Sequence, residues 1–340
     1  MNAAIKKSVY KALASTGIHR ALHGVLNKGQ LSILMYHGVV QEPLDFEDWI
    51  MLDAAAFSGQ MDYLQKHFRV VSMSKAFEML CQGEISEPTA VITFDDGYQN
   101  NFEVAYPILQ KRNLPASIYL ATNLINTNAS LKLGELTEAF VKTRESSLEW
   151  RDSIYNLTAK TDRIESLQTI KAMLKREHID TVFQEVGNIC SLLLGESSVN
   201  VTKDSPYRML DTQSIREMAD SGLIEFGAHT LNHAILSNLD RSEQQKEIND
   251  SVEAVSALSQ RSCDFFAYPN GTPQDYNQDT LDVVQASEVK AALTTIEGTC
   301  NPKTHTSELR RFGVGADMDL VTFELMVHNF IGGIKALIRS

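Results

Sequence analysis

The sequence predicts an α/β fold with a mostly parallel sheet, and three observations support this. Short apolar runs typical of β-strands recur along the chain, stretches with helical spacing lie between several of them, and one long segment breaks the alternation. Strands that alternate with helices are typical of α/β folds. About six or seven such runs fit a closed or nearly closed barrel as well as an open sheet.

The predicted strands are short and rich in β-branched and aromatic residues. They are SILMY (32–36), AVITF (90–94), ASIYLA (116–121), LIEFGA (223–228), DFFAY (264–268) and KAALTT (290–295). The predicted helices between them include DAAAFSGQMDYLQKHF (53–68), FEVAYPILQKRN (102–113) and RSEQQKEINDSVEAVSALSQ (241–260). The last of these follows Asp240, a good helix cap.

The segment from about 123 to 208 contains no convincing strand. Three stretches in it read as helices, at 133–157, 161–178 and 179–196. We interpret the segment as a helical insertion between two strands of the sheet. Such an insertion would lie over one end of the fold, where loops commonly carry function.

The two ends of the chain have a distinct charge pattern. Residues 1–30 form a predicted amphipathic helical segment with no acidic residue before Glu42 and five basic ones, Lys6, Lys7, Lys11, Arg20 and Lys28. The pattern fits contact with an anionic membrane surface, and it fits equally a helix that caps the domain with a solvated basic face. Residues 321–340 are a second predicted amphipathic helix, which leaves 31–320 for the main domain.

The composition limits the class of protein. A formal net charge of -12 and a pI of about 5.2 argue against nucleic-acid binding, which needs clustered positive charge. No apolar run is long enough for a secretory signal or a transmembrane helix. The four cysteines form no CxxC pair and are expected to be reduced thiols: Cys81, Cys190, Cys263 and Cys300. We therefore predict a cytoplasmic protein, with contact at the inner face of the membrane as an open alternative.

Two adjacent carboxylates, Asp95 and Asp96, directly follow the apolar run 90–94, and Gly97 then permits a tight turn. In parallel α/β folds, ligands bind at the carboxyl ends of the strands. Two carboxylates there can divide the work, because one can bind a metal while the other acts as a general base. The alternative is that an aspartate caps a helix after the strand.

Three further strand-like runs end in residues that can carry chemistry. His229 and His233 follow one run, and their spacing of four would place both imidazoles on one side of a helical turn, where they could bind one metal ion. The turn Pro269-Asn270-Gly271 follows another run, and His37 follows a third. Taken singly, the histidines could be structural and the turn a plain turn. Their joint occurrence at strand ends favours a site.

The motifs TFDDGY (93–98), HTLNH (229–233) and AYPNG (267–271) resemble the three principal motifs of the polysaccharide deacetylases, the NodB-homology or carbohydrate esterase family 4 enzymes. The resemblance runs in order from about Ser32 to Val314 and skips the insertion. It implies a distorted (β/α)7 barrel that holds a divalent metal, with zinc as the default. YH at 36–37, ahead of the acidic motif, resembles a rearranged branch of the family.

The resemblance also implies a role for each motif residue. Asp95 would be the general base, while Asp96, His229 and His233 would hold the metal. Water activated by the metal and deprotonated by Asp95 would attack an acetamide carbonyl, and the metal and a backbone N–H near Asn270 would stabilise the oxyanion. Pro269, Asn270 and Gly271 are therefore predicted to contact the substrate.

Two departures from the family pattern concern the acid and the orienting arginine. Many members carry the acid in a C-terminal Leu-x-His motif, but His328 lies in the predicted C-terminal helix, so we predict that His37 protonates the leaving amine. Many members also have an arginine where this chain has Ala267. We expect Arg310 or Arg311 to supply that charge.

The predicted function is removal of N-acetyl groups from an amino sugar of a polysaccharide or surface glycan. Two alternatives stay open, namely an O-acetyl esterase and a glycan-binding protein that keeps the fold without turnover. A serine hydrolase is disfavoured because no GxSxG motif occurs. The predicted partner is an N-acetylated glycan.

Overall fold

The computed structural model describes residues 12, 14–199 and 201–339. Its centre is a curled parallel sheet with the strand order β11-β10-β9-β6-β5-β1-β12, and β4 pairs with β5 outside this path. The strands are β1 (Leu31–Tyr36), β4 (Arg69–Val70), β5 (Thr89–Phe94), β6 (Ala116–Leu120), β9 (Ile224–Ala228), β10 (Phe265–Ala267), β11 (Ala291–Leu293) and β12 (Phe312–Gly313). All six predicted runs are strands, and the predicted α/β barrel is confirmed.

The sheet is a distorted barrel because its two edge strands are not paired directly. The segment between β11 and β12 bridges them, with backbone hydrogen bonds from Thr294 to Leu309 and from Arg311 to Ile296. Every residue of β1 and β5 is buried, as expected for parallel strands covered on both faces.

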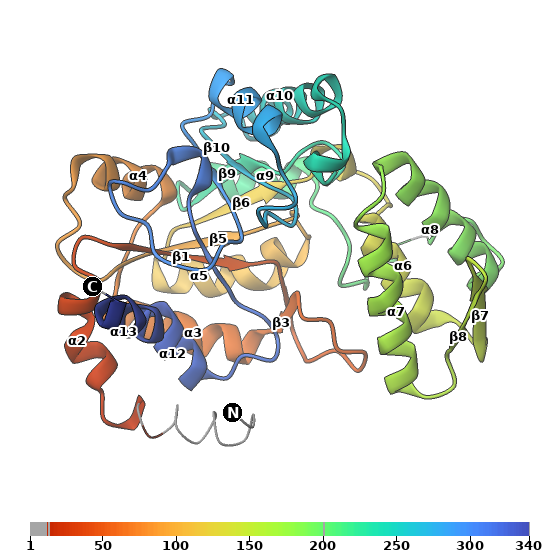
Figure 1. Ribbon diagram of the computed structural model, residues 1–340, viewed down its shortest axis with the longest axis horizontal. Coiled ribbons are helices and arrows are strands. Elements are labelled where there is room, and N and C mark those ends of the chain that lie inside the picture. Colours follow the sequence, from red (N-terminus) through yellow and green to blue (C-terminus); the bar gives the residue numbers. More distant parts are fainter. Residues whose placement is uncertain (1–11, 13, 200, 340) are drawn as a thin grey trace.

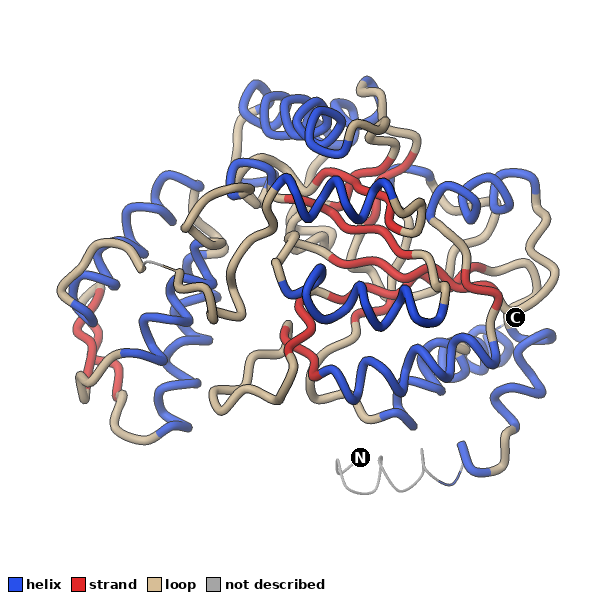
Figure 2. Tube along the Cα trace, turned by 180° about the vertical axis from the view of Figure 1, so that it is seen from behind, coloured by secondary structure: helices blue, strands red, loops and turns tan. Residues whose placement is uncertain are grey.

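Helices pack around the outside of the sheet (Figures 1 and 2). They are α3 (Ala54–His67), α4 (Met73–Gln82), α5 (Tyr106–Arg112), α9 (Thr212–Asp220), α10 (Arg241–Ser259), α11 (Gln278–Ala286) and α12 (Leu320–Val327). Most begin at a side-chain cap, and Asp240 and Glu243 form a capping box at the start of α10. A small parallel pair, β2 (Gly38–Val40) with β3 (Met51–Asp53), extends beyond the end of β1.

The segment predicted as a helical insertion lies between β6 and β9 and has its own hydrophobic core. Its helices are α6 (Lys132–Lys142), α7 (Lys160–Leu174) and α8 (Ile179–Leu194), which stand beside the barrel in Figure 1. The prediction of helix over 133–157 is wrong in its second half, because an antiparallel hairpin, β7 (Ser147–Trp150) with β8 (Ser153–Asn156), follows α6. Its two turn residues, Arg151 and Asp152, have φ of 49° and 57°, the backbone of a tight hairpin turn.

The prediction of a single C-terminal helix is also wrong, because the helix is interrupted between α12 and α13 (Phe330–Arg339). Asn329 has a φ of 45° and its side chain donates a hydrogen bond to Asn27 Oδ1 at 3.0 Å. Asn27 follows α2 (Ile18–Leu26), and its own amide donates to the His328 carbonyl at 2.6 Å. The end of α2 is therefore held beside the junction of α12 and α13 (Figure 1).

A buried histidine cluster fixes α2 to the barrel. His19 Nε2 lies 3.1 Å from the Tyr63 hydroxyl, which lies 3.0 Å from His328 Nε2, and His328 Nδ1 lies 2.9 Å from His23 Nδ1. Burial, followed by the neighbouring His23, lowers the pKa of His328 to about 2, and burial lowers the pKa of His23 to about 4. The cluster is therefore neutral near pH 7.

This neutrality predicts loss of stability in acid. In the unfolded chain these histidines take up protons as the pH falls through about 6.5, whereas the folded protein keeps His23 neutral down to about pH 4. Stability present above pH 6.5 is therefore lost between about 6.5 and about 4. Urea unfolding at about pH 7 and about pH 5 measures the loss. The free energy of unfolding should fall less on acidification in His23→Gln than in the wild type. In the control His305→Gln, which changes an exposed histidine, it should fall as much as in the wild type. Equal losses in all three proteins would contradict the prediction.

Within the described residues, no helix has the length and apolar character needed to cross a membrane. Residues 1–11 of the predicted N-terminal segment lie outside the described residues, but α2 is described. It turns His19 and His23 inward and leaves Ile18 and Val25 exposed, Val25 at 73%. Peripheral membrane contact and a cytoplasmic location stay predictions.

Vesicle binding tests the membrane contact. If α2 meets an anionic membrane, Val25→Asp should reduce cosedimentation with phosphatidylglycerol vesicles, because it places a negative charge on the contacting face. Ile154→Asp is the matched control, since Ile154 is 78% exposed on the hairpin of the insertion. Equal binding of both variants and the wild type would contradict membrane contact through α2.

Candidate active site and metal centre

The carboxyl ends of four strands of the parallel sheet bring the predicted site residues together. His37 follows β1, Asp95 and Asp96 follow β5, His229 follows β9, and Asn270 follows β10. All of these residues, with His233, line one cavity of about 460 Å³. The parallel sheet explains this convergence, because the carboxyl ends of its strands share one edge.

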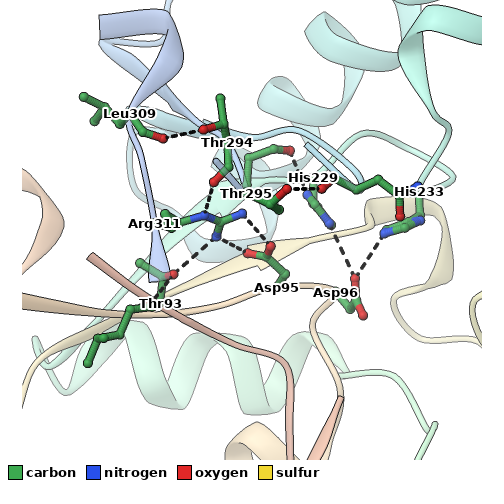
Figure 3. Close-up of polar contacts among 12 residues, drawn as sticks. Thr93, Asp95, Asp96, His229, His233, Thr294, Thr295, Leu309 and Arg311 are labelled. Atoms are coloured by element: carbon green, nitrogen blue, oxygen red, sulfur yellow. Dashed lines mark hydrogen bonds and ion pairs between the residues drawn. The ribbon is translucent and has the colours of Figure 1, made fainter. Parts of the chain in front are cut away.

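Asp96, His229 and His233 form a compact set of potential metal ligands (Figure 3). The Asp96 Oδ1 atom lies 3.5 Å from His229 Nε2 and 3.3 Å from His233 Nε2, and it is buried without a hydrogen-bond partner among the described residues. Ligands of a tetrahedral zinc ion at about 2.0–2.1 Å are separated by roughly 3.4 Å. The three residues therefore fit a divalent ion, and three protein ligands leave a coordination position free.

A backbone contact orients one of these ligands. His229 Nδ1 lies 2.7 Å from the Ala267 carbonyl, an acceptor, so Nδ1 carries the proton and Nε2 faces Asp96. A hydrogen bond of this kind fixes the tautomer of a metal-binding histidine. Ala267, which stands where many members of the family carry an arginine, thus contributes through its backbone.

The predicted helical turn for the HxxxH motif is wrong. Residues 229–235 form an irregular loop between β9 and a short 3₁₀ helix, in which Thr230 and His233 have φ of 63° and 57°. The Thr230 hydroxyl accepts a hydrogen bond from Ala234 N, and Glu247 accepts from the Leu231 and Asn232 amides. These contacts, rather than helical periodicity, bring the two imidazole rings to a centroid distance of 4.8 Å.

Asp95 points away from these ligands and forms a buried ion pair with Arg311. The guanidinium donates to Asp95 Oδ1 and Oδ2, each at 2.7 Å, and Arg311 is fully buried. Asp96 has a φ of 78°, so the chain turns sharply between the two carboxylates. Figure 3 shows each carboxylate facing a different partner. Among the described contacts neither carboxylate caps a helix, which excludes the capping alternative.

The rest of the Arg311 side chain is held by the barrel. Its Nε donates to the Thr294 carbonyl at 2.8 Å, and its Nη1 lies 3.3 Å from the Thr93 hydroxyl. Of the two predicted arginines, Arg311 therefore supplies the charge, whereas Arg310 is exposed. The adjacent pair gave no local signal to distinguish them, because the choice depends on which face of the short β12 region turns inward.

The site electrostatics favour ionised carboxylates. Burial raises the pKa of Asp95, but Arg311 and His229 outweigh it, so the pKa lies below its ordinary value. For Asp96, burial is likewise outweighed, by the adjacent imidazoles of His229 and His233, and the pKa lies well below its ordinary value. Burial lowers the pKa of His229, but the raising effect of the two carboxylates is larger, so that the pKa lies above 6.5.

His37 lines the same cavity and packs against Trp49, with ring centroids 5.8 Å apart. Its Nδ1 is buried without a hydrogen-bond partner among the described residues. Burial lowers the pKa of His37, and the opposing effects of Asp96 and Asp95 do not cancel this. A lowered pKa makes the protonated form a stronger acid but a less populated one near pH 7.

Of the three residues predicted to contact the substrate, one lines the cavity and two shape the turn behind it. Asn270 lines the cavity, and its N–H has no acceptor within the described residues, while its carbonyl accepts from the Thr295 hydroxyl at 2.6 Å. Pro269 and Gly271 do not line the cavity, although Pro269 O accepts from Gly271 N at 2.7 Å and closes the turn. A Cβ on Gly271, at a φ of 64°, would lie 2.9 Å from Thr295 N.

His328, the second candidate for the acid, does not contribute to this site. The Ser32 hydroxyl, near the start of β1, donates to the neighbouring Val327 carbonyl at 2.8 Å, whereas His37 follows the end of the same strand. A strand of this length spans about 17–20 Å. His328 therefore lies at the opposite end of the barrel.

Sequence reasoning missed residues that enter the cavity from loops and from the insertion. Trp49 is the clearest example on the barrel side, and Gly315 leaves room for it, because a Cβ there would lie 1.9 Å from its Nε1. Lys132 and Lys171 reach the cavity from α6 and α7. Nothing local in the sequence marks these residues, since their role depends on how the insertion packs.

Exchange of Arg311 for Lys tests its contact with Asp95. Lysine keeps the charge but cannot donate in the bidentate geometry, so the Asp95 pKa should rise. The acid limb of the pH profile of kcat/KM should move to higher pH by about one unit or more, and kcat should fall. Arg310→Lys, an exposed neighbour, should leave the profile unchanged. An unaltered profile in both variants would rule out this role for Arg311.

Comparison with known proteins identifies the family. A sequence model of the polysaccharide deacetylase family matches residues 82–292. The curated Bacillus subtilis protein YxkH, whose name places it among the polysaccharide deacetylases, is 22% identical over 291 residues, which are 85% of this chain and 73% of YxkH.

Solved structures resemble the chain in fold. The deacetylase PplD of Streptococcus pyogenes, in complex with acetate, gives a TM-score of 0.59 at 19% identity, over 88% of this chain and 98% of PplD. IcaB from Ammonifex degensii gives a TM-score of 0.57 at 16% identity, over 89% of this chain and 98% of IcaB. At such identities the likeness shows the shared barrel.

Proposed function

We propose that this chain, which belongs to the polysaccharide deacetylase family, is a metal-dependent hydrolase that removes N-acetyl groups from an amino sugar of a glycan. Membership of the family supports glycan deacetylation as the reaction. The observation that carries the finer assignment is the division between the adjacent carboxylates. Asp96 faces two histidines, while Asp95 is paired with Arg311 at the same cavity.

Asp96, His229 and His233 would hold the ion, with zinc as the first candidate. A divalent ion in such a site supplies Lewis acidity, which polarises a carbonyl and makes water a better nucleophile near neutral pH. The protein holds His229 in the required tautomer through the Ala267 carbonyl. A rigid ligand set of this kind avoids reorganisation during the reaction.

Asp95 is the proposed general base. Arg311 keeps its carboxylate ionised and fixes its orientation, so that it can take a proton from the attacking water. Arg311 acts here as a positioning residue, because it contacts Asp95 and does not line the cavity. The N–H of Asn270 is a candidate donor to the oxygen that becomes negative during attack.

His37 is the proposed acid. An amine is a poor leaving group unless its nitrogen is protonated, and His37 lines the cavity with Asp95 and Asp96. An ester needs this proton less, so an acid at this position favours the amide. The same residues could still support O-deacetylation, which keeps it as the alternative.

Substrate comparison tests the proposal. Zinc-reconstituted protein is incubated with N-acetylated chitooligosaccharides and with an O-acetylated glycan, and both acetate and free amine are measured. The proposal expects acetate and amine from the first substrate. Acetate from the second substrate alone would assign an esterase, and glycan binding without acetate from either would assign a binding protein.

A further inference from the structure

The insertion places lysines on the wall of the cavity that holds the candidate metal ligands. Gln168, Lys171 and Lys175 line it from α7 and the residue after it, at spacings that put them on one face of the helix. Lys132 joins them from α6. The same cavity is lined by four carboxylates, so what matters is which of these charges are already paired: Asp48, Asp95, Asp96 and Glu177.

Lys171 is the central residue of this group, because its charge is largely buried and poorly matched. Its side chain is 13% exposed, and its one ion-pair partner among the described residues, Asp48, lies at 3.7 Å, beyond ordinary hydrogen-bond distance. Asp48 Oδ2 already accepts from the Tyr207 hydroxyl at 2.8 Å, and its Oδ1 lies 3.4 Å from Ile50 N. The Lys171 ammonium therefore has N–H donors at the cavity that no described residue accepts. Burial lowers the pKa of Lys171.

Most of the other charges at this wall are paired. Lys132 pairs with Glu135 at 2.8 Å, and Glu177, an acidic residue of the cavity, pairs at 2.8 Å with Arg151, which also contacts Glu185 at 3.1 Å. Lys175 is exposed and has no ion pair within the described residues. Across the cavity, Asp95 is matched by Arg311, and Asp96 faces two histidines. An anionic group on a bound sugar would thus meet Lys171 and Lys175 without a competing free carboxylate other than Asp48.

We propose that Lys171 and Lys175 form an anion subsite, and that the substrate is an N-acetylated amino sugar carrying a phosphate group. This inference rests on the proposed function, since the subsite shares its cavity. The basic side chains that line the cavity from the insertion are lysines, and lysine binds phosphate as a compact point charge with several N–H donors. Leu174, Ile179 and Val182 line the same wall and give it an apolar part.

Two sources could supply such a phosphate, and matched substrates distinguish them. Acetate release is measured for N-acetylglucosamine methyl glycoside, for N-acetylglucosamine 1-phosphate, and for N-acetylglucosamine linked to a short prenyl diphosphate. We expect kcat/KM to be about 10- to 100-fold higher for a phosphorylated substrate than for the neutral one, the range of one charge-assisted hydrogen bond. Preference for the prenyl compound over the sugar phosphate would identify a lipid-linked source, and the reverse a soluble one.

The variant Lys171→Met assigns the effect to the subsite. It should lower kcat/KM for the phosphorylated substrates to nearly the neutral value, chiefly through KM, and leave the neutral substrate within about twofold. Lys142→Met is the matched control, because it also removes one positive charge from the insertion. Lys142 lies on α6, pairs with Glu138 at 3.0 Å and does not line the cavity. An equal loss on all substrates, or a preference for a uronate-containing glycan over the phosphates, would overturn the proposal.

Calorimetric binding separates this inference from the proposed reaction. Lys171-dependent binding of N-acetylglucosamine 1-phosphate without acetate release would support the subsite and contradict the deacetylase. Deacetylation of neutral and phosphorylated sugars at equal rates, unchanged by Lys171→Met, would support the deacetylase and overturn the subsite.

Discussion

Asparagine in place of Asp95 is expected to lower the rate of acetate release by about 10²- to 10⁴-fold, the usual contribution of a general base. Asparagine keeps the shape of the side chain and one acceptor for Arg311, but it cannot take a proton. Because Asp95 is not among the metal-ligand set, the variant should bind zinc with the stoichiometry of the wild type. Steady-state rates and metal analysis together measure the two effects.

A matched control is available on the surface. Asp62 also pairs with an arginine, Arg112, at 2.7 Å, but it is exposed and outside the cavity. Asp62→Asn removes the same charge from the same kind of pair and should retain full activity. Full activity in Asp95→Asn would contradict the assignment of the base.

Removal of the metal is expected to abolish turnover, and its return should stabilise the folded protein. An ion that binds only the folded state adds about 2.7 kcal/mol of stability at a concentration 100-fold above its Kd. The chelated protein should therefore melt at a lower temperature, and zinc should restore both the melting temperature and acetate release. Calorimetry with and without zinc measures the first effect independently of activity.

The histidine ligands give this prediction its control. His229→Ala should remove the zinc-dependent rise in melting temperature, because it deletes one of the three proposed ligands, which is buried. His305→Ala changes an exposed histidine away from the cavity and should keep the rise. A rise of equal size in both variants would place the ion elsewhere.

The sequence allowed prediction of the sheet and of the residues at its functional edge. Apolar runs such as 90–94 are strands because both faces of a parallel sheet are buried, so their composition is a strong local signal. Once those strands are parallel, Asp95, His229 and His37 must share one edge. The family motifs added the metal, the base and the acid, which remain predictions for this chain.

Features that depend on long-range packing were harder to predict. The HxxxH spacing suggested a helix, but two left-handed residues and the Glu247 contacts form a loop instead. The choice of Arg311 over Arg310 depends on which face of the region before β12 turns toward the segment that follows β11. The role of Lys171 depends on how α7 packs against the loop that carries Asp48, and the local sequence does not predict that contact.

The most direct test of metal-dependent N-deacetylation counts both products from one substrate. Zinc-loaded protein and its chelated form are incubated with N-acetylated chitooligosaccharides, and acetate and free amine are measured over time. We expect the loaded protein to release them in equal amounts, and the chelated protein and Asp95→Asn to release neither above background. Acetate without matching amine, or equal release by the chelated protein, would contradict the account.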